Sequence, residues 1–175
     1  VSDAIFYQIF PDRFANGDLS NDDPAISKGL FDRTKRRFYH GGDLQGVIAR
    51  LPYLKELGVT VLWLNPWYEN NNRLNEMEKY EGQAITDYHG YGATDFYSVE
   101  EHFGDLNKLR ELVDKAHALG MKVVQDQVGN HSGPYHPWVS DAPLPDWYHG
   151  TKAAHPEEDW QTWALMDRGA TRPAT

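Results

Sequence analysis

One pattern of residues occurs twice in this chain and restricts its fold more than any other feature. Residues Leu54–Pro66 (LKELGVTVLWLNP) and Ala116–Val128 (AHALGMKVVQDQV) each run from a helical segment through Leu-Gly into a short apolar segment and then polar residues. A glycine after a helical segment is the usual left-handed stop, and the apolar run after it predicts a buried strand. Strands that alternate with helices in this way predict parallel strands joined by helical crossovers, and therefore an α/β fold.

The other periodic segments fit the same plan. Ala4–Phe10 predicts a first buried strand, because it is apolar and aromatic-rich and ends at a proline. Asp43 and Asp105 are predicted N-caps of two amphipathic helices that run to the two Leu-Gly stops. Pro52 lies inside the first helix and predicts a kink or a restart there. The stretch from Trp67 to Phe103 is long and polar and predicts an irregular loop.

The lengths of the connections distinguish between the two common parallel architectures. The long loops follow the predicted strands, whereas each helix-to-strand connection is predicted to be a single residue. This asymmetry favours a (β/α)8 (TIM) barrel over an open, doubly wound sheet. We predict the first three strand–helix units of a TIM barrel over residues 1–131, and over 132–175 the start of an irregular subdomain inserted after the third strand. Because a barrel needs roughly 200 residues or more, both ends of the chain are interpreted as cut.

Composition excludes several classes of function. The formal net charge of −9 argues against nucleic acid or an anionic membrane as partner. No apolar run approaches the ~18 residues of a membrane span. The absence of cysteine excludes disulfides and thiolate-bound metals. It leaves the compartment open: periplasmic, secreted and cytoplasmic locations are all possible, and a periplasmic or secreted one is slightly preferred.

Two polar clusters are candidate sites. Asp126, Asn130 and His131 follow the third predicted strand, at the edge where parallel α/β sheets bind ligands. The alternative is that Asp126 and Asn130 only close a turn. The loop Asn16–Asp22 (NGDLSND) is rich in oxygen-bearing side chains, which suits either a calcium site or a solvated turn.

Five motifs, taken together and in order, resemble the α-amylase family of glycoside hydrolases, and most of all its cyclomaltodextrinase and neopullulanase branch. They are YQIFPDRFANGD (Tyr7–Asp18), GGDLQG (Gly41–Gly46), GVTVLWLNP (Gly58–Pro66), YHGYGATDFY (Tyr88–Tyr97) and DQVGNH (Asp126–His131). The resemblance implies a retaining enzyme that cleaves α-1,4-glucosidic bonds of cyclomaltodextrins, maltooligosaccharides, pullulan or starch.

The resemblance also implies roles for individual residues. Tyr91, His131 and, less directly, His89 correspond to positions that hold the sugar in family members. Asp126 and Asn130 correspond to supporting residues that shape the end of the strand. The calcium loop of the family would be formed by Asn16, Asp18, Asn21, Asp22, the carbonyl of Gly41, and Asp43, which is also the predicted N-cap. Calcium is therefore the expected cofactor.

No residue of the chain corresponds to the catalytic carboxylates, which in the family lie on later strands and are expected beyond Thr175. We therefore expect this chain alone to be inactive. Two alternatives stay open: the larger protein is a non-catalytic barrel that binds sugar or a partner, or the chain is a complete, open α/β binding domain. The sequence also leaves open whether a larger protein forms a homodimer.

Overall fold

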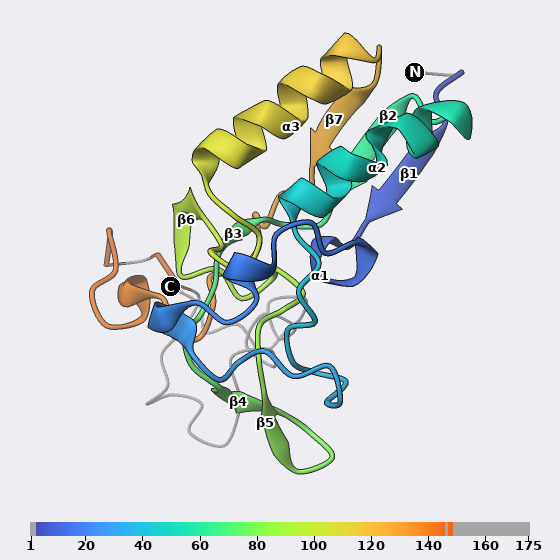
Figure 1. Ribbon diagram of the computed structural model, residues 1–175. Coiled ribbons are helices and arrows are strands. Elements are labelled where there is room, and N and C mark those ends of the chain that lie inside the picture. The colour runs from blue at the N-terminus through green and yellow to red at the C-terminus, as the bar shows by residue number, and fades with distance from the viewer. Residues whose placement is uncertain (1–2, 146, 149–175) are drawn as a thin grey trace.

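The computed structural model describes residues 3–145 and 147–148 (Figure 1). Its centre is a parallel sheet in the order β1 (Phe6–Ile9), β2 (Val61–Leu64) and β7 (Lys122–Gln125). Helix α2 (Leu44–Glu56) connects β1 to β2, and α3 (Leu106–Ala118) precedes β7. The predicted α/β class and parallel sheet are confirmed. We predicted three strand–helix units. The described residues contain the three parallel strands but only two of the crossover helices, α2 and α3.

The two helices lie side by side along one face of this sheet (Figure 1). Their apolar stripes face the strands, so the core is formed where Leu44, Leu51 and Leu54 of α2 and Leu112 of α3 meet Leu62 of β2. All five side chains are at most 2 % exposed. Hydrophobic packing on this face therefore holds the helices on the sheet.

The strands are shorter and more exposed than the apolar pattern predicts. In β7 no side chain is fully buried, and in β1 only Ile9 is. Phe6, Trp63 and Val124 are 48 %, 39 % and 39 % exposed. The prediction that the first and third strands are buried is wrong for the described residues, because helices cover only one face of the sheet there.

Both helix N-caps are confirmed. The Asp43 carboxylate accepts from the Gly46 N–H, and the Asp105 carboxylate accepts from the Lys108 N–H. Helix α2 does not restart at Pro52, which lies within one continuous helix. A proline removes a helical hydrogen bond, but the buried leucines on both sides of it keep the helix on the sheet.

The helix-to-strand connections are longer than the predicted single residue. Residues 57–60 separate α2 from β2, and residues 119–121 separate α3 from β7. Gly58 and Gly120 adopt φ values of +90° and +75°, which end the helices. The chain then needs further extended residues to reach the first ladder pair of each strand, which explains the difference.

The stretch after β2 is more ordered than predicted. Strands β3 (Tyr68–Glu69) and β6 (Asp95–Val99) pair antiparallel, and β4 (Asn75–Tyr80) forms a hairpin with β5 (Gln83–Ile85). These strands are short and interrupted by polar residues, so none has an apolar run long enough to reveal it. The remaining elements are short helical turns: α1 (Pro11–Phe14), η1 (Leu19–Asn21), η2 (Ala25–Ser27) and η3 (Pro137–Val139).

The region after β7 contains η3 and otherwise irregular chain as far as the described residues reach. Most of the predicted subdomain, residues 149–175, lies outside them. Among the described residues, no helix combines the length and apolar character needed to cross a membrane.

Candidate functional site

Tyr91 is the centre of an assembly that contains most of the residues predicted for the sugar site. Its hydroxyl donates to Asp126 Oδ2 at 2.8 Å. Its backbone N–H donates to His89 Nδ1 at 3.0 Å, and its carbonyl lies 3.0 Å from His131 Nε2. Asn130 reaches the assembly through His131, since its Nδ2 lies 3.3 Å from His131 Nδ1. The structure thus brings all five predicted residues together.

The sheet places Asp126 in this assembly. Asp126 follows β7 directly, and its N–H donates to the carbonyl of Leu64, the last residue of β2. Its Oδ2 atom therefore lies at the carboxyl edge of the sheet, where Trp63 Nε1 also donates to it at 3.2 Å. One carboxylate oxygen accepts hydrogen bonds from a strand residue and from Tyr91, which joins the sheet to the loop.

The Tyr91 loop is fixed by close backbone packing. Gly90 adopts φ +89°, and a Cβ atom there would overlap the carbonyl of Pro66, just past β2. Burial, with the charge of Asp126 and the hydrogen bond to it, raises the pKa of Tyr91 to about 12. The phenol therefore stays neutral near pH 7, so this group can donate hydrogen bonds and present a ring face, but it cannot act as a base.

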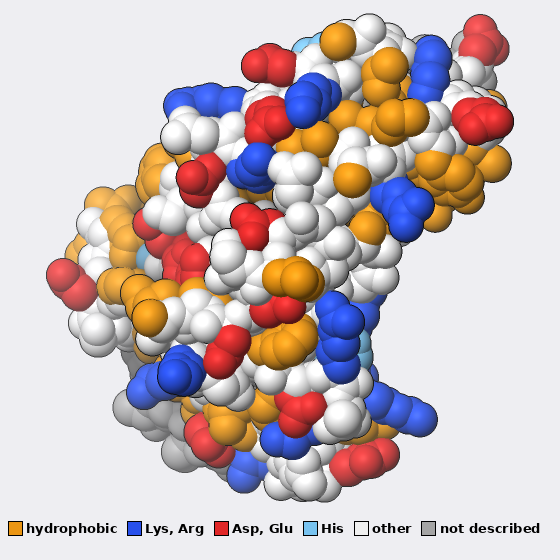
Figure 2. All heavy atoms as spheres, viewed as in Figure 1, with side chains coloured by type: hydrophobic (Ala, Val, Ile, Leu, Met, Phe, Trp, Pro, Cys, Tyr) orange, Lys and Arg blue, Asp and Glu red, His pale blue; other side chains and the backbone are white. Residues whose placement is uncertain are grey.

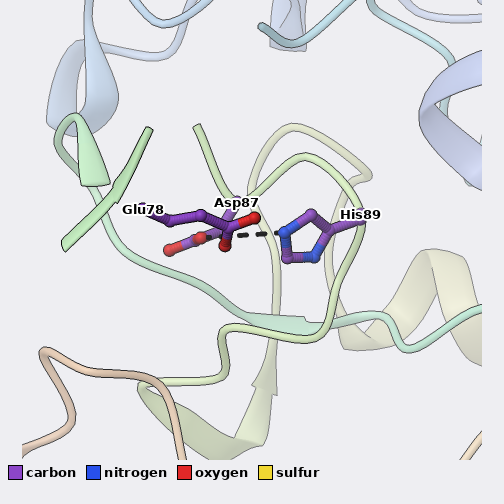
Figure 3. Close-up of side chains that lie close together, drawn as sticks. All are labelled: Glu78, Asp87 and His89. Carbon is purple, nitrogen blue, oxygen red and sulfur yellow. Dashed lines mark ion pairs between the residues drawn. The ribbon is translucent and has the colours of Figure 1, made fainter. Parts of the chain in front are cut away.

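His89 is enclosed by protein groups. Its Nδ1 accepts from Tyr91, and its Nε2 lies 3.9 Å from Asp87 Oδ1 (Figure 3). Burial, followed by the charges of Arg37 and His131, lowers the pKa of His89 to about 4. The imidazole is neutral at pH 7 with its proton on Nε2, directed toward Asp87. In this structure one ring nitrogen of His89 supports the Tyr91 backbone and the other faces Asp87.

Asp87 is a buried residue that sequence reasoning missed. It is 0 % exposed, and its Oδ1 accepts from Asn75 Nδ2 of β4 at 2.9 Å. Burial, with a contribution from Glu78, raises its pKa to about 7. In the sequence it looks like any polar residue of a loop, and only the folding of the β4–β5 hairpin over it makes it buried.

Glu78, Asp87 and His89 have the composition of a metal site (Figure 3). Their potential ligand atoms lie within 4.8 Å of one another. However, an imidazole that accepts the Tyr91 N–H at Nδ1 carries its hydrogen on Nε2, and this leaves no lone pair toward Asp87. The observed hydrogen bonds therefore favour a histidine–carboxylate pair over metal ligation.

The predicted calcium loop is folded around three of its residues. Asn16 Nδ2 donates to Asp22 Oδ1 at 2.6 Å, and Gly41 packs so closely on both side chains that a Cβ atom would overlap them. The Oδ1 atoms of Asn16 and Asn21 are buried and accept no hydrogen bond from the described residues. Buried oxygens without donors are what a hard cation such as calcium binds, so these residues fit the ion.

Asp43 and Asp18 have hydrogen-bonding roles of their own. The Asp43 carboxylate accepts from the backbone N–H groups of Gly17, Asp18 and Gly46. Asp18 Oδ1 accepts from the N–H and the hydroxyl of Ser20. Both carboxylates therefore shape the loop in this structure, in addition to any contact with an ion.

A second buried acidic cluster was also missed. Glu100 is 1 % exposed and accepts from the N–H of Asn70, and burial raises its pKa. Burial and the neighbouring Glu101 raise the pKa of Glu69 to about 8. Since Glu100 and Glu101 are adjacent in a polar segment, nothing in the sequence separates them from ordinary surface residues.

Comparisons with known proteins identify the family of the chain. The sequence matches the catalytic domain of alpha amylase over residues 8–174. It is 44 % identical over 134 residues to neopullulanase 2 of Thermoactinomyces vulgaris, covering 76 % of this chain and 20 % of that protein. It is 42 % identical over 133 residues to a cyclomaltodextrinase of Thermoanaerobacter pseudethanolicus, covering 76 % and 20 %.

Solved structures give the same result. An Anoxybacillus alpha-amylase superposes with a TM-score of 0.71 at 42 % identity, covering 85 % of this chain and 28 % of that one. A cyclomaltodextrin glucanotransferase superposes with a TM-score of 0.70 at 46 % identity, covering 75 % and 26 %. The chain spans about a fifth of the length of the two relatives named first. It belongs to the α-amylase family of glycoside hydrolases, whose catalytic domain is a TIM barrel, and it is similar to the cyclomaltodextrinases and neopullulanases of that family.

Proposed function

We propose that this chain is the first part of the catalytic barrel of a retaining α-glucan hydrolase. Its substrates would be the α-1,4-glucosidic bonds of cyclomaltodextrins, maltooligosaccharides, pullulan or starch. The observation that carries the proposal is the assembly around Tyr91, at the carboxyl edge of a parallel sheet. The names of the similar neopullulanase and cyclomaltodextrinase support this substrate class.

In this proposal Tyr91 and His131 hold one glucosyl unit. Tyr91 offers a ring face for stacking on the sugar. Both ring nitrogens of His131 contact protein groups in this structure, so His131 would exchange one of these contacts for a sugar hydroxyl on binding. Asp126 accepts from the Tyr91 hydroxyl and so fixes the angle of the ring, and Asn130 adjoins His131. His89 lies behind Tyr91 and supports its backbone.

The bond-breaking groups would come from outside the chain. A retaining glycosidase needs one carboxylate as nucleophile and one carboxylic acid that protonates the leaving oxygen. The Tyr91 assembly has a single carboxylate, Asp126, and that group already accepts two hydrogen bonds. Similarity to the α-amylase family implies that the catalytic pair lies on later strands of a longer protein, beyond Thr175.

We further propose that calcium binds the loop formed by Asn16, Asp18, Asn21, Asp22 and Gly41, next to Asp43. The buried Oδ1 atoms of Asn16 and Asn21 support this, because each lacks a donor among the described residues. When bound, the ion would hold this loop against the segment that precedes α2. The ion would stabilise the fold and would not contact the sugar.

The test is a substrate screen on the longer protein with Tyr91→Ala, Tyr91→Phe and the unchanged sequence. Hydrolysis of a cyclomaltodextrin is expected, and Tyr91→Ala should lower kcat/KM at least about a hundredfold because it removes the stacking ring. Tyr91→Phe keeps the ring and should lose much less. A protein that binds maltooligosaccharides without cleaving them would identify the non-catalytic alternative.

The 175-residue chain itself should release no reducing sugar from a cyclomaltodextrin or a maltooligosaccharide. The physical reason is that the Tyr91 assembly binds but has no acid and nucleophile pair. A reducing-sugar assay with the purified chain checks this expectation. Turnover that survives repeated purification would contradict the assignment of the catalytic pair to later strands.

A further inference from the structure

A pocket separate from the Tyr91 assembly lies between the loop before α2 and the β4–β5 hairpin. Its volume is about 360 Å³, within the range of sites that hold small ligands. One wall is the run Thr34–Arg37, and the other is formed by Tyr80 and Glu81 at the end of the hairpin. Figure 2 shows Lys and Arg side chains gathered at the lower right of the visible face, the region in which Figure 1 places this loop and the hairpin.

The pocket is cationic although the chain is acidic. Lys35, Arg36 and Arg37 all line it, whereas Glu81 is the one carboxylate residue in its lining, in a chain of net charge −9. Among the described residues, neither Arg36 nor Arg37 forms an ion pair with a carboxylate. The charge of Glu78 also acts on Arg37, and Lys35 pairs with Asp32 at 3.5 Å. Within the described part of the chain, the two guanidinium groups therefore lack a direct ion pair with a carboxylate, although Glu78 lies near enough to Arg37 to act on its charge.

The aromatic ring of Tyr80 positions both arginines. The guanidinium carbon of Arg37 lies 4.8 Å from the centre of the Tyr80 ring, and Arg37 Nη1 donates to the Tyr88 hydroxyl at 2.9 Å. Arg36 Nη1 lies 3.4 Å from the Tyr80 hydroxyl. The hairpin thus holds the two side chains on the same wall, with most of their N–H donors still available.

The backbone behind this wall is fixed. Arg13 Nη2 donates to the carbonyls of Arg36 and Phe38 at 2.7 and 3.0 Å. The N–H of Thr86, next to β5, donates to the carbonyl of Arg37 at 2.9 Å. The loop is therefore tied to α1 on one side and to the hairpin on the other, so binding would require little ordering of the chain.

We propose that this pocket binds a phosphate group, held by Arg36 and Arg37 with Lys35 nearby. Planar guanidinium groups bind phosphate oxygens through paired, charge-assisted hydrogen bonds. The phosphate would belong either to inorganic phosphate or to a small phosphorylated sugar, whose ring would occupy the remaining volume beside Tyr80. The proposal does not rest on the glucan hydrolase function, since none of the five residues of the Tyr91 assembly lines the pocket, although the charge of Arg37 also acts on His89.

The test is isothermal titration calorimetry of the full chain with inorganic phosphate and, separately, with glucose 1-phosphate, at constant ionic strength. Phosphate should bind with a Kd of about 1 mM or tighter. Arg36→Gln should weaken binding about tenfold, because a hydrogen bond to a charged group is lost. Arg50→Gln, which removes an exposed arginine of α2, should leave binding unchanged.

A second variant gives an effect in the opposite direction. Glu81→Gln removes the carboxylate from the pocket and should tighten binding by up to about fivefold. Tighter binding of glucose 1-phosphate than of inorganic phosphate would identify a sugar phosphate as the ligand, and the reverse would identify the free anion. Absence of binding by both ligands, or equal losses in Arg36→Gln and Arg50→Gln, would overturn the proposal.

Discussion

At the scale of single residues, Asp126 joins the sheet to the loop that carries Tyr91. One of its oxygens accepts from Trp63 of β2 and from the Tyr91 hydroxyl. Both donors would lose this acceptor if the side chain were truncated, and polar groups left without partners lower stability.

Trp63 is partly exposed, so water can replace its acceptor, and Asp126→Ala should reduce the free energy of unfolding by about 0.5–1.5 kcal/mol, as measured by urea denaturation. Asp114→Ala is the matched control, since Asp114 is an exposed carboxylate of α3. Equal stability of the two variants would show that the Asp126 hydrogen bonds contribute nothing.

Asp126 adds to the effect of burial in raising the pKa of Tyr91. Removal of the negative charge in Asp126→Asn should lower the Tyr91 pKa from about 12 toward the ordinary tyrosine value near 10. NMR titration of ring-labelled tyrosine in the two proteins measures this difference. An unchanged pKa would mean that burial alone raises it.

Asp87 and His89 make opposite contributions to the pH dependence of stability. The Asp87 pKa is about 7 in the folded chain and near 4 when unfolded, so the unfolded state releases a proton that the native state keeps. Stability from Asp87 therefore falls as the pH rises from about 4 to 7. The His89 pKa is lowered to about 4, so its contribution rises with pH between about 4 and 6.5.

Asp87→Asn removes one of these two contributions. Relative to the unchanged chain, the variant should gain stability with rising pH by up to about 1.4 kcal/mol per pH unit between pH 4 and 7. Urea denaturation at several pH values measures the difference in stability between the two proteins. Glu69, whose pKa is also raised, is present in both, so its contribution cancels. Parallel stability curves would contradict the buried, protonated state of Asp87.

At the scale of elements, the two crossover helices begin in the same way but depend on their caps to different degrees. Asp105 accepts from one backbone N–H, that of Lys108. Asp43 accepts from three, and two of these belong to the loop at Gly17 and Asp18. Asp43 therefore caps α2 and also fixes the loop that is the proposed calcium site.

Asp43→Ala should reduce the free energy of unfolding by about 2–4 kcal/mol, and Asp105→Ala by about 1 kcal/mol. Chemical denaturation in the presence of EDTA measures both losses without bound calcium. If Asp43 acts only as a calcium ligand, its larger effect should disappear in EDTA; if it acts as a cap, the effect should persist.

At the scale of the whole molecule, three strands and two helices leave one face of the sheet exposed within the described residues. Phe6 of β1 and Val124 of β7 are among the exposed apolar side chains. In such an arrangement we expect contacts within the loops around the sheet to contribute much of the stability of the fold. The proposed calcium ion would add to it by joining the segments at Asn16 and Gly41.

Removal of calcium should therefore lower the melting temperature. A ligand at one hundred times its Kd stabilises a fold by about 2.7 kcal/mol, and EDTA should abolish this gain. Asp22→Ala should make the chain insensitive to EDTA, whereas Asp114→Ala should remain sensitive. Scanning calorimetry with and without calcium checks the expectation, and an EDTA effect of equal size in Asp22→Ala would place the ion elsewhere.

Local signals determined the framework of this protein. The Leu-Gly stops, the N-caps at Asp43 and Asp105, and the apolar runs predicted the order of the parallel strands and their crossover helices. Each of these features depends on a few residues that are neighbours in the chain, so it can be recognised from the sequence alone. The five motifs, which include Tyr88–Tyr97 and Asp126–His131, indicated the family for the same reason, and the family match confirms it.

Only the tertiary structure determined which polar residues are buried and which line a pocket. Asp87 and Glu100 are buried only because segments distant in the sequence fold over them, and the Arg36–Arg37 wall forms a pocket only opposite the β4–β5 hairpin. The protein partners of His89, Tyr91 and Asp87, were likewise known only from the structure. Burial and hydrogen-bond partners depend on contacts between distant segments, and a linear pattern of residue types does not contain those contacts.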